Sequence, residues 1–120
     1  MGADHYIREA NPAGVGKFLL PSIGPSNWQK VITIGETNPN VYFGLGVHPY
    51  FLNDCSQGAL EELEAHLKAL PSRCVAIGEC GLDFAIDVDR LKQETSFILQ
   101  LKLAQKYQLP LIVHERKSYN

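Results

Sequence analysis

Apolar residues along the chain form four short runs, and the stretches between them have helical periodicity. The runs cover residues 15–21, 41–47, 75–77 and 111–113, each bounded by glycine, proline or polar residues. Short, continuous apolar runs separated by helices are typical of strands that are buried on both faces of a parallel sheet. The pattern therefore predicts four parallel β-strands in one sheet.

Three helices are expected between these runs. The clearest repeats leucine every three or four residues over 60–70 and ends at Pro71. A weaker one covers residues 26–34, with Ser26 as its N-cap and Gly35 at its end. The longest covers residues 89–107. Its expected buried stripe consists of Leu91, Phe97, Ile98, Leu101 and Ala104.

The resulting order, β-α-β-α-β-α-β, defines an α/β fold built of parallel β/α units. No shift in composition divides the chain, so we expect residues 1–120 to form a single domain, with residues 1–13 as a loose lead-in. A complete eight-stranded barrel typically needs about 200–250 residues. With 120 residues, the chain has room for a partial barrel.

Composition narrows the functional classes. The net charge is −2, so a nucleic-acid contact would have to be local rather than driven by a general positive field. No apolar stretch approaches the roughly 18 residues of a membrane span, and no secretory signal is expected at the N-terminus. Three cysteines without a CxxC pair favour reduced thiols over a disulfide framework or a zinc knuckle. We therefore expect a cytoplasmic protein without a membrane partner.

Three of the predicted strands run into a residue that can bind a metal or move a proton. These residues are His48, Glu79 and His114. The carboxyl ends of parallel strands lie at the same end of a sheet, where loops and side chains converge. The sequence therefore predicts a functional site at this end of the sheet.

Strand alternation predicts where the side chains around Glu79 point. Glu79 is expected on the same face as Val75 and Ile77, because residues two apart share a face. Cys80 is then expected on the opposite face, in the core, and not as a nucleophile.

Each candidate also has a purely structural interpretation. Glu79 could be a buried acid satisfied by an arginine or backbone donors, His114 a hydrogen-bonded core histidine, and His48 a turn cap. A carboxylate and a histidine at equivalent ends of adjacent strands form a mixed oxygen and nitrogen set that suits zinc, manganese or magnesium. We therefore predict Glu79 and His114 as metal ligands, and His48 as a residue of the substrate pocket.

Two further polar residues follow these strands. Arg116 could grip a phosphate with two hydrogen bonds, or pair with Asp83 or Glu115. Asp83 could orient a neighbouring side chain or cap a turn. The choice stays open for Arg116, whereas a structural role is favoured for Asp83.

Several strings between residues 14 and 116 occur in the order and spacing of one family. They are Gly14-Val15, Gly46-Val47-His48-Pro49, Ala76-Ile77-Gly78-Glu79-Cys80-Gly81-Leu82-Asp83, the helix positions Gln93, Phe97, Gln100-Leu101 and Leu103-Ala104, and Leu109-Pro110-Leu111-Ile112-Val113-His114-Glu115-Arg116. Together they resemble the TatD family of metal-dependent hydrolases, which are (β/α)-barrel enzymes linked to deoxyribonuclease activity. The resemblance implies that the chain forms half of a TIM-type barrel.

The resemblance also implies roles. Glu79 matches the family's carboxylate ligand, which is shared by two metal ions, and His114 matches a further metal-binding histidine. His48 and Arg116 match pocket positions, and no position is assigned as the catalytic residue. The implied cofactor is a divalent metal (Mg, Mn or Zn), with two ions in the full-length family. The implied substrate is DNA or another phosphodiester, attacked by metal-activated water.

The chain departs from the family pattern at both ends. The family opens with an Asp-x-His-x-His string, whereas this chain has Asp4-His5-Tyr6 without a second histidine two residues after His5. The family's later histidine and metal-binding aspartate lie beyond Asn120. Only two of the expected ligand positions are present in the chain. We therefore expect a truncated TatD-like hydrolase with an incomplete metal site, which is inactive rather than active in isolation. The alternative is a catalytically silent fragment that folds or self-assembles without turnover.

A half-barrel also predicts assembly. Its two edge strands have unpaired backbone groups, and its inner apolar side chains lose half of their core. A homodimer would cover both. The inner residues expected to be exposed in the monomer are Leu45, Val75, Ile77 and Ile112.

Overall fold

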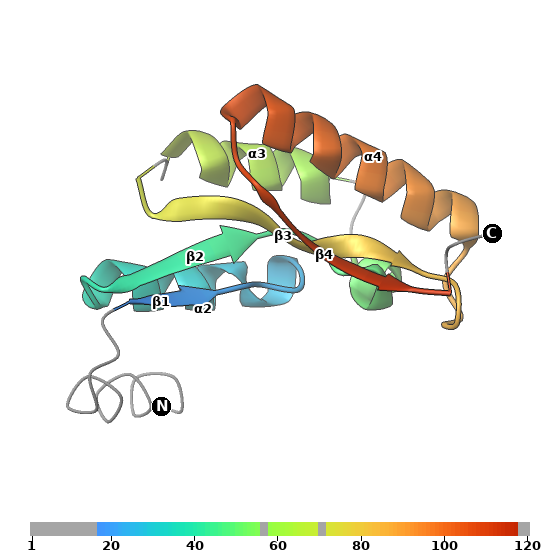
Figure 1. Cartoon of the computed structure of the whole chain (residues 1–120), viewed down its shortest axis with the longest axis horizontal. Coiled ribbons are helices and arrows are strands. Elements are labelled where there is room, and N and C mark those ends of the chain that lie inside the picture. Colours follow the sequence, from blue (N-terminus) through green and yellow to red (C-terminus); the bar gives the residue numbers. More distant parts are fainter. Residues whose placement is uncertain (1–16, 56–57, 70–71, 118–120) are drawn as a thin grey trace.

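The computed structural model describes residues 17–55, 58–69 and 72–117, and it contains one four-stranded sheet (Figure 1). The strands follow the chain order β1-β2-β3-β4, and every neighbouring pair is parallel. This confirms the prediction of parallel β/α units that form a half-barrel. The lead-in predicted for residues 1–13 lies outside the described residues. The strands are β1 (Phe18–Leu20), β2 (Val41–Leu45), β3 (Cys74–Asp83) and β4 (Leu111–Arg116).

Helices connect the strands. They are α2 (Pro25–Thr37), α3 (Ala59–Ala69) and α4 (Arg90–Tyr107), and a short 3-10 helix, η2 (Pro49–Asp54), follows β2. Residues of all three α-helices join one core cluster with residues of β2 and β3, so the helices cover the same face of the sheet (Figure 1). No helix in the described part of the chain is long and apolar enough to span a membrane.

The core lies between the sheet and the helices. Trp28, Phe43 and Leu63 are almost completely buried there. Leu45 and Ile77 are also 0% exposed and belong to this cluster, so the prediction that they line an open interior is wrong. Both point to the helix side of the sheet, where the chain itself covers them.

The opposite face of the sheet is only partly covered. Val75 and Ile112 are half-buried, as expected for residues of an open interior. Leu19 in β1 is 47% exposed, because its neighbours on either side turn toward the core. The prediction of an incompletely covered inner face therefore holds for this set of side chains.

Helix α2 runs past the glycine that was expected to end it. Gly35 lies inside α2, and a Cβ atom built there would lie 2.7 Å from Cδ2 of Phe43. The missing side chain therefore lets α2 approach β2 closely, which is a packing role and not a helix stop.

Helix α4 buries a polar face. Its buried residues are Gln93, Ser96, Gln100 and Ala104. Leu91 is 69% exposed and Ile98 49% exposed, so the predicted apolar stripe is wrong at these two positions. The inward face of α4 meets backbone groups near the ends of the strands, and glutamine side chains can pair with such groups where leucine cannot.

Candidate functional site

Glu79 and His114 lie inside strands that are longer than predicted. Strand β3 continues through Glu79 to Asp83, and β4 continues through His114 to Arg116. In the pairing of these strands, Gly78 lies opposite Ile112 and Cys80 opposite Val113, which leaves Glu79 as an extra residue. Such a bulge redirects a side chain locally.

The bulge changes the predicted alternation. Ile77 and Cys80, three residues apart, both belong to the helix-side core, so the expectation that Glu79 shares a face with Ile77 is wrong. The core position predicted for Cys80 is confirmed, because its side chain is 0% exposed. Burial, together with the Glu79 carboxylate, raises the pKa of Cys80 to about 12. A thiol that stays protonated at neutral pH is a poor nucleophile.

A glycine in β3 allows β4 to approach at the site. Gly81 pairs with His114 and has φ of 136°. A Cβ atom at this position would overlap the carbonyl oxygen of His114. The absence of a side chain at Gly81 therefore helps to bring His114 beside β3.

His48 lies against both predicted metal ligands. Its Nε2 atom is 3.9 Å from Oε1 of Glu79, and its ring centroid is 4.5 Å from that of His114. The three side chains come from the segment after β2, from β3 and from β4. The structure therefore brings together three residues that the sequence placed at the same end of the sheet.

His48 also caps the short helix η2, as its structural interpretation predicted. Its Nδ1 atom accepts a hydrogen bond of 3.0 Å from the Tyr50 amide. Burial and the nearby His114 lower the pKa of His48, against opposing effects of Glu79 and Asp83. The ring is therefore neutral at pH 7, and with Nδ1 as acceptor its hydrogen is on Nε2. This tautomer makes His48 a hydrogen-bond donor toward Glu79 or an anion, and not a metal ligand through Nε2.

Asp83 holds the other side of the site. Its side chain is 3% exposed, and its Oδ2 atom is 2.9 Å from Nε2 of His114. Nε of Arg116 donates to both carboxylate oxygens, at 3.0 and 3.1 Å, and the Ala85 amide donates to Oδ1. Both roles considered for Asp83, orienting a neighbour and capping a turn, are present.

The charge state of Asp83 determines the state of His114. Burial alone would raise the pKa of Asp83, but hydrogen bonds from His114, Arg116 and Ala85 outweigh it and lower the pKa to about 2. An ionised carboxylate accepts hydrogen bonds only, so Nε2 of His114 carries the hydrogen and the lone pair of a neutral ring lies on Nδ1. Carboxylates orient metal-binding histidines in this way.

Arg116 combines an anchored nitrogen with a largely exposed side chain. Nε binds Asp83, while the side chain as a whole is 55% exposed. The pairing with Asp83 and the phosphate-binding role are therefore compatible, because the outer N–H groups of a guanidinium can still bind a phosphate with two hydrogen bonds.

Two buried glutamines hold the backbone on which these residues lie. In Gln93, Oε1 accepts from the Asp83 amide at 2.7 Å, and Nε2 donates to the Asp83 carbonyl at 3.0 Å. In Gln100, Oε1 accepts from the Val47 amide and Nε2 donates to the Val47 carbonyl, one residue before His48. Both glutamines belong to the sequence motifs of the family, but no role was predicted for them. Their spacing of seven, on the same face of a helix, was the available signal.

The chemistry of the candidate ligand atoms fits a divalent metal, but there are too few of them for a complete metal site. Carboxylate oxygens of Glu79 and Nδ1 of His114 are ligands that zinc and manganese accept. Within residues 17–55, 58–69 and 72–117, however, no three His, Cys, Asp or Glu side chains lie close enough together to hold an ion. The described residues by themselves therefore do not form a complete metal site.

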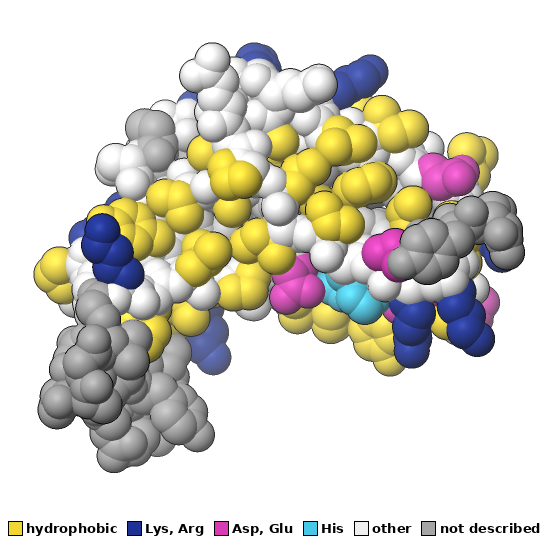
Figure 2. Space-filling model, in the orientation of Figure 1, with side chains coloured by type: hydrophobic (Ala, Val, Ile, Leu, Met, Phe, Trp, Pro, Cys, Tyr) yellow, Lys and Arg dark blue, Asp and Glu magenta, His cyan; other side chains and the backbone are white. Residues whose placement is uncertain are grey.

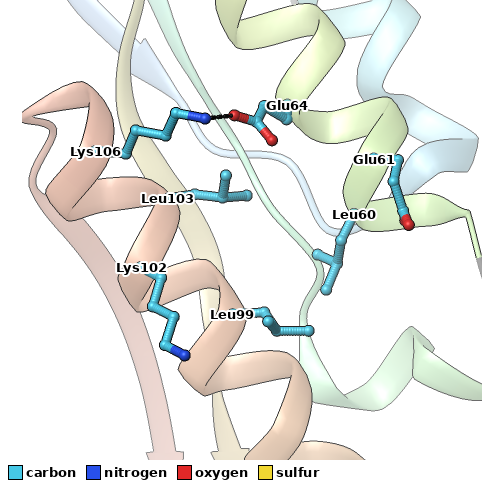
Figure 3. Close-up of a pocket in the computed structure, with 7 residues that line it drawn as sticks. All are labelled: Leu60, Glu61, Glu64, Leu99, Lys102, Leu103 and Lys106. Carbon is cyan, nitrogen blue, oxygen red and sulfur yellow. Dashed lines mark hydrogen bonds and ion pairs between the residues drawn. The ribbon is translucent and has the colours of Figure 1, made fainter.

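The site lies at one end of the open sheet face and not in a deep hollow. Figure 2 shows apolar side chains spread over this face, with the acidic and histidine side chains and some of the basic ones toward one end. Two hollows lie on the helix side, with volumes of about 340 and 300 Å³. The first is lined by Leu60, Leu99 and Leu103 and has the Glu64–Lys106 ion pair at one end (Figure 3). Neither hollow contains a predicted site residue.

A parallel half-barrel with carboxylate and histidine side chains at its strand ends is typical of (β/α)-barrel enzymes. The family model described as "TatD related DNase" matches residues 2–120. The chain therefore belongs to the TatD-related DNase family, as the motifs predicted.

Individual relatives agree with this assignment. The "Uncharacterized metal-dependent hydrolase YjjV" of Escherichia coli K12 is 37% identical over 115 residues, which are 95% of this chain and 44% of the relative. The "3'-5' ssDNA/RNA exonuclease TatD" of Escherichia fergusonii is 34% identical over 97% of this chain and 44% of its own length. This chain thus spans less than half the length of these curated relatives.

Solved structures show the same fold. The crystal structure of YjjV, a TatD homologue from E. coli, superposes on this chain with a TM-score of 0.89 at 36% sequence identity. The superposition covers 98% of this chain and 46% of the YjjV chain. A TatD family hydrolase from Entamoeba histolytica gives a TM-score of 0.82 at 30% identity, over 93% of this chain and 40% of its own.

Proposed function

We propose that the chain carries part of the active site of a metal-dependent phosphodiesterase that acts on nucleic acid. Glu79 and His114 are the proposed ligands of a divalent ion (Mg, Mn or Zn), and His48 and Arg116 the proposed residues of the substrate pocket. The observation that carries the proposal is the position of His48 against both Glu79 and His114. Nucleic acid as the substrate is supported by the names of relatives, such as the ssDNA/RNA exonuclease TatD.

Each residue has a task that follows from its contacts. Asp83 keeps the Nε2 hydrogen of His114 in place and so presents Nδ1 as a ligand atom. His48 presents its Nε2 hydrogen to a phosphoryl oxygen, and Arg116 binds the same group through its outer nitrogens. A divalent ion bound here would lower the pKa of its water and offset phosphoryl charge.

The number of ligands limits the activity of the 120-residue chain. Catalytic zinc sites usually have three protein ligands, whereas this proposal names two. We therefore expect weak metal binding and only slow cleavage of DNA by the isolated chain. The buried Cys74 and Cys80 are not in disulfides, which supports the proposed cytoplasmic location.

A second candidate function is self-assembly without turnover. Leu19 in β1 and Val113 in β4 are 47% and 50% exposed, and these two strands are the edges of the sheet in the described residues. Exposed apolar residues along open strand edges favour a partner. We propose a two-fold homodimer that pairs these edges and places two copies of Glu79 and His114 in one particle.

A metal-dependent nuclease assay tests the first proposal. The chain and its Glu79→Gln variant are incubated with 5'-labelled single-stranded DNA and Mn²⁺, beside a full-length TatD relative as positive control. The Glu61→Gln variant, altered at an exposed position on α3, is the matched control. We expect slow cleavage that Glu79→Gln lowers at least tenfold and Glu61→Gln leaves unchanged. Cleavage in EDTA, or full cleavage by Glu79→Gln, would contradict the proposal.

The same samples distinguish the second candidate. A chain that does not cleave DNA but elutes as a dimer in light scattering would favour self-assembly without turnover. A strict monomer at all concentrations would exclude it.

A further inference from the structure

An exposed aromatic side chain stands directly beside the proposed site. Tyr50, in η2, is 60% exposed, whereas Phe51 next to it is partly buried. The ring centroids of Tyr50 and His48 are 6.5 Å apart, and His48 in turn contacts Glu79 and His114. Tyr50 is thus one ring away from the proposed metal ligands.

Tyr50 is held in place by its described neighbours, and both of its aromatic neighbours contact it at an edge. Its amide donates to Nδ1 of His48, and its ring makes edge contacts with His48 and with Phe51, at 5.3 Å from the latter. The interplanar angle is 77° in both contacts, so neither ring stacks parallel to Tyr50. A large aromatic ring fixed in an exposed position offers contact area at little cost in conformational entropy.

The charges around Tyr50 indicate the chemistry of its partner. Arg116 is more than half exposed, and Nζ of Lys92 reaches η2 through a hydrogen bond of 3.2 Å to Asn53. Arg116 is linked to Tyr50 through Asp83, His114 and His48. An exposed aromatic ring that belongs to the same cluster of side chains as a cationic guanidinium matches a molecule that combines a flat base with a phosphate. In duplex DNA the base faces are covered by their neighbours, so only a single strand can offer one to Tyr50.

We infer that Tyr50 is a stacking platform for one nucleobase of single-stranded nucleic acid, beside a phosphate bound by His48 and Arg116. This inference rests on the proposed function and adds a base-binding residue to its substrate pocket. Phe51 supports the platform, because its amide donates to the His48 carbonyl and its ring contacts both neighbours. Tyr50 itself is a specificity residue and takes no part in the chemistry.

Binding without turnover gives the cleanest test. Fluorescence anisotropy measures the affinity of the chain for a fluorescein-labelled oligothymidylate of eight nucleotides in EDTA, which prevents cleavage. Loss of one stacked base costs about 1–3 kcal/mol, so we expect Tyr50→Ala to weaken binding about 5- to 150-fold. Tyr50→Phe and Tyr50→Trp keep an aromatic face and are expected to stay within about threefold of the original affinity.

Two controls separate stacking from other effects. Leu91→Ala removes an exposed apolar side chain on α4 and should leave the affinity unchanged. An abasic oligomer of the same length, and a blunt duplex, should bind the original chain and Tyr50→Ala equally. Circular dichroism of Tyr50→Ala shows whether it is folded, and the Phe and Trp variants test the inference independently of that result.

The outcomes are distinct from those of the nuclease assay. If Tyr50→Ala binds the oligothymidylate as tightly as the original chain, or loses equal affinity for the abasic oligomer, the stacking inference is wrong even when Glu79-dependent cleavage is observed. If the chain does not bind the single strand, the inference is also wrong. If Tyr50-dependent binding occurs without Glu79-dependent cleavage, the inference stands and the proposed hydrolysis fails.

Discussion

The two faces of the sheet differ in what holds them together. The helix side is filled by apolar side chains such as Phe43 and Leu63, which the chain covers completely. The strand ends on the other side carry polar groups, of which Glu79 and His114 are about one-third exposed. Buried Asp83 contacts His114, and buried Gln100 binds the backbone of Val47 next to His48. Apolar packing therefore stabilises this half-barrel, whereas a polar network positions its site.

The largest expected effect contrasts one leucine from each face. Leu63→Ala removes a fully buried side chain and is expected to lower the free energy of unfolding by about 3 kcal/mol. Leu19→Ala, on the open face, is expected to lower it by less than about 1 kcal/mol. Urea denaturation of both variants measures the difference. Equal losses would mean that the open face is covered as well as the helix side.

The next effect concerns the polar network. Gln100→Ala leaves the amide and carbonyl of Val47 without their buried partner, and we expect a loss of about 2 kcal/mol in the free energy of unfolding. Gln105→Ala, at an exposed position of the same helix, is the matched control and should change it by less than about 0.5 kcal/mol. The NMR signals of His48 should shift in the first variant only. Unchanged His48 signals in Gln100→Ala would show that the glutamine does not position the site.

A smaller effect appears in the pH dependence of stability. The pKa of Asp83 is about 2 in the folded chain and 3.8 for an unperturbed aspartate. Because the folded value is the lower one, the stabilisation is present above pH 4 and is lost as the pH falls toward 2. We expect the original chain to lose roughly 1–2 kcal/mol more over this range than Asp83→Asn, measured by urea denaturation at each pH. Parallel pH profiles of the two proteins would contradict the ionised, paired state of Asp83.

The sequence was sufficient for the fold because its apolar runs and helical spacers alternate clearly. It was also sufficient to predict that His48, Glu79 and His114 lie together, since residues at equivalent ends of parallel strands become neighbours. The bulge at Glu79 could not be predicted, because an extra residue is defined only by the register with β4. Alternation from Ile77 therefore assigned Glu79 to the wrong face.

Helix α4 shows a second limit. Hydrophobic periodicity counts apolar residues, and Leu91 and Ile98 led to the wrong face of this helix. The true inward face carries Gln93 and Gln100, whose partners are backbone groups of Asp83, at the end of β3, and of Val47, just after β2. A polar side chain is suitable for burial only when such partners exist, and these become visible in the three-dimensional structure.

The most direct test of the account is the location of a bound divalent ion. Mn²⁺ added at low concentration to the ¹⁵N-labelled chain broadens the NMR signals of nearby residues. The account predicts broadening that centres on Glu79 and His114 and disappears in Glu79→Gln. Broadening that centres on the acidic residues of α3, Glu61 and Glu62, and persists in Glu79→Gln would contradict a metal site at the strand ends.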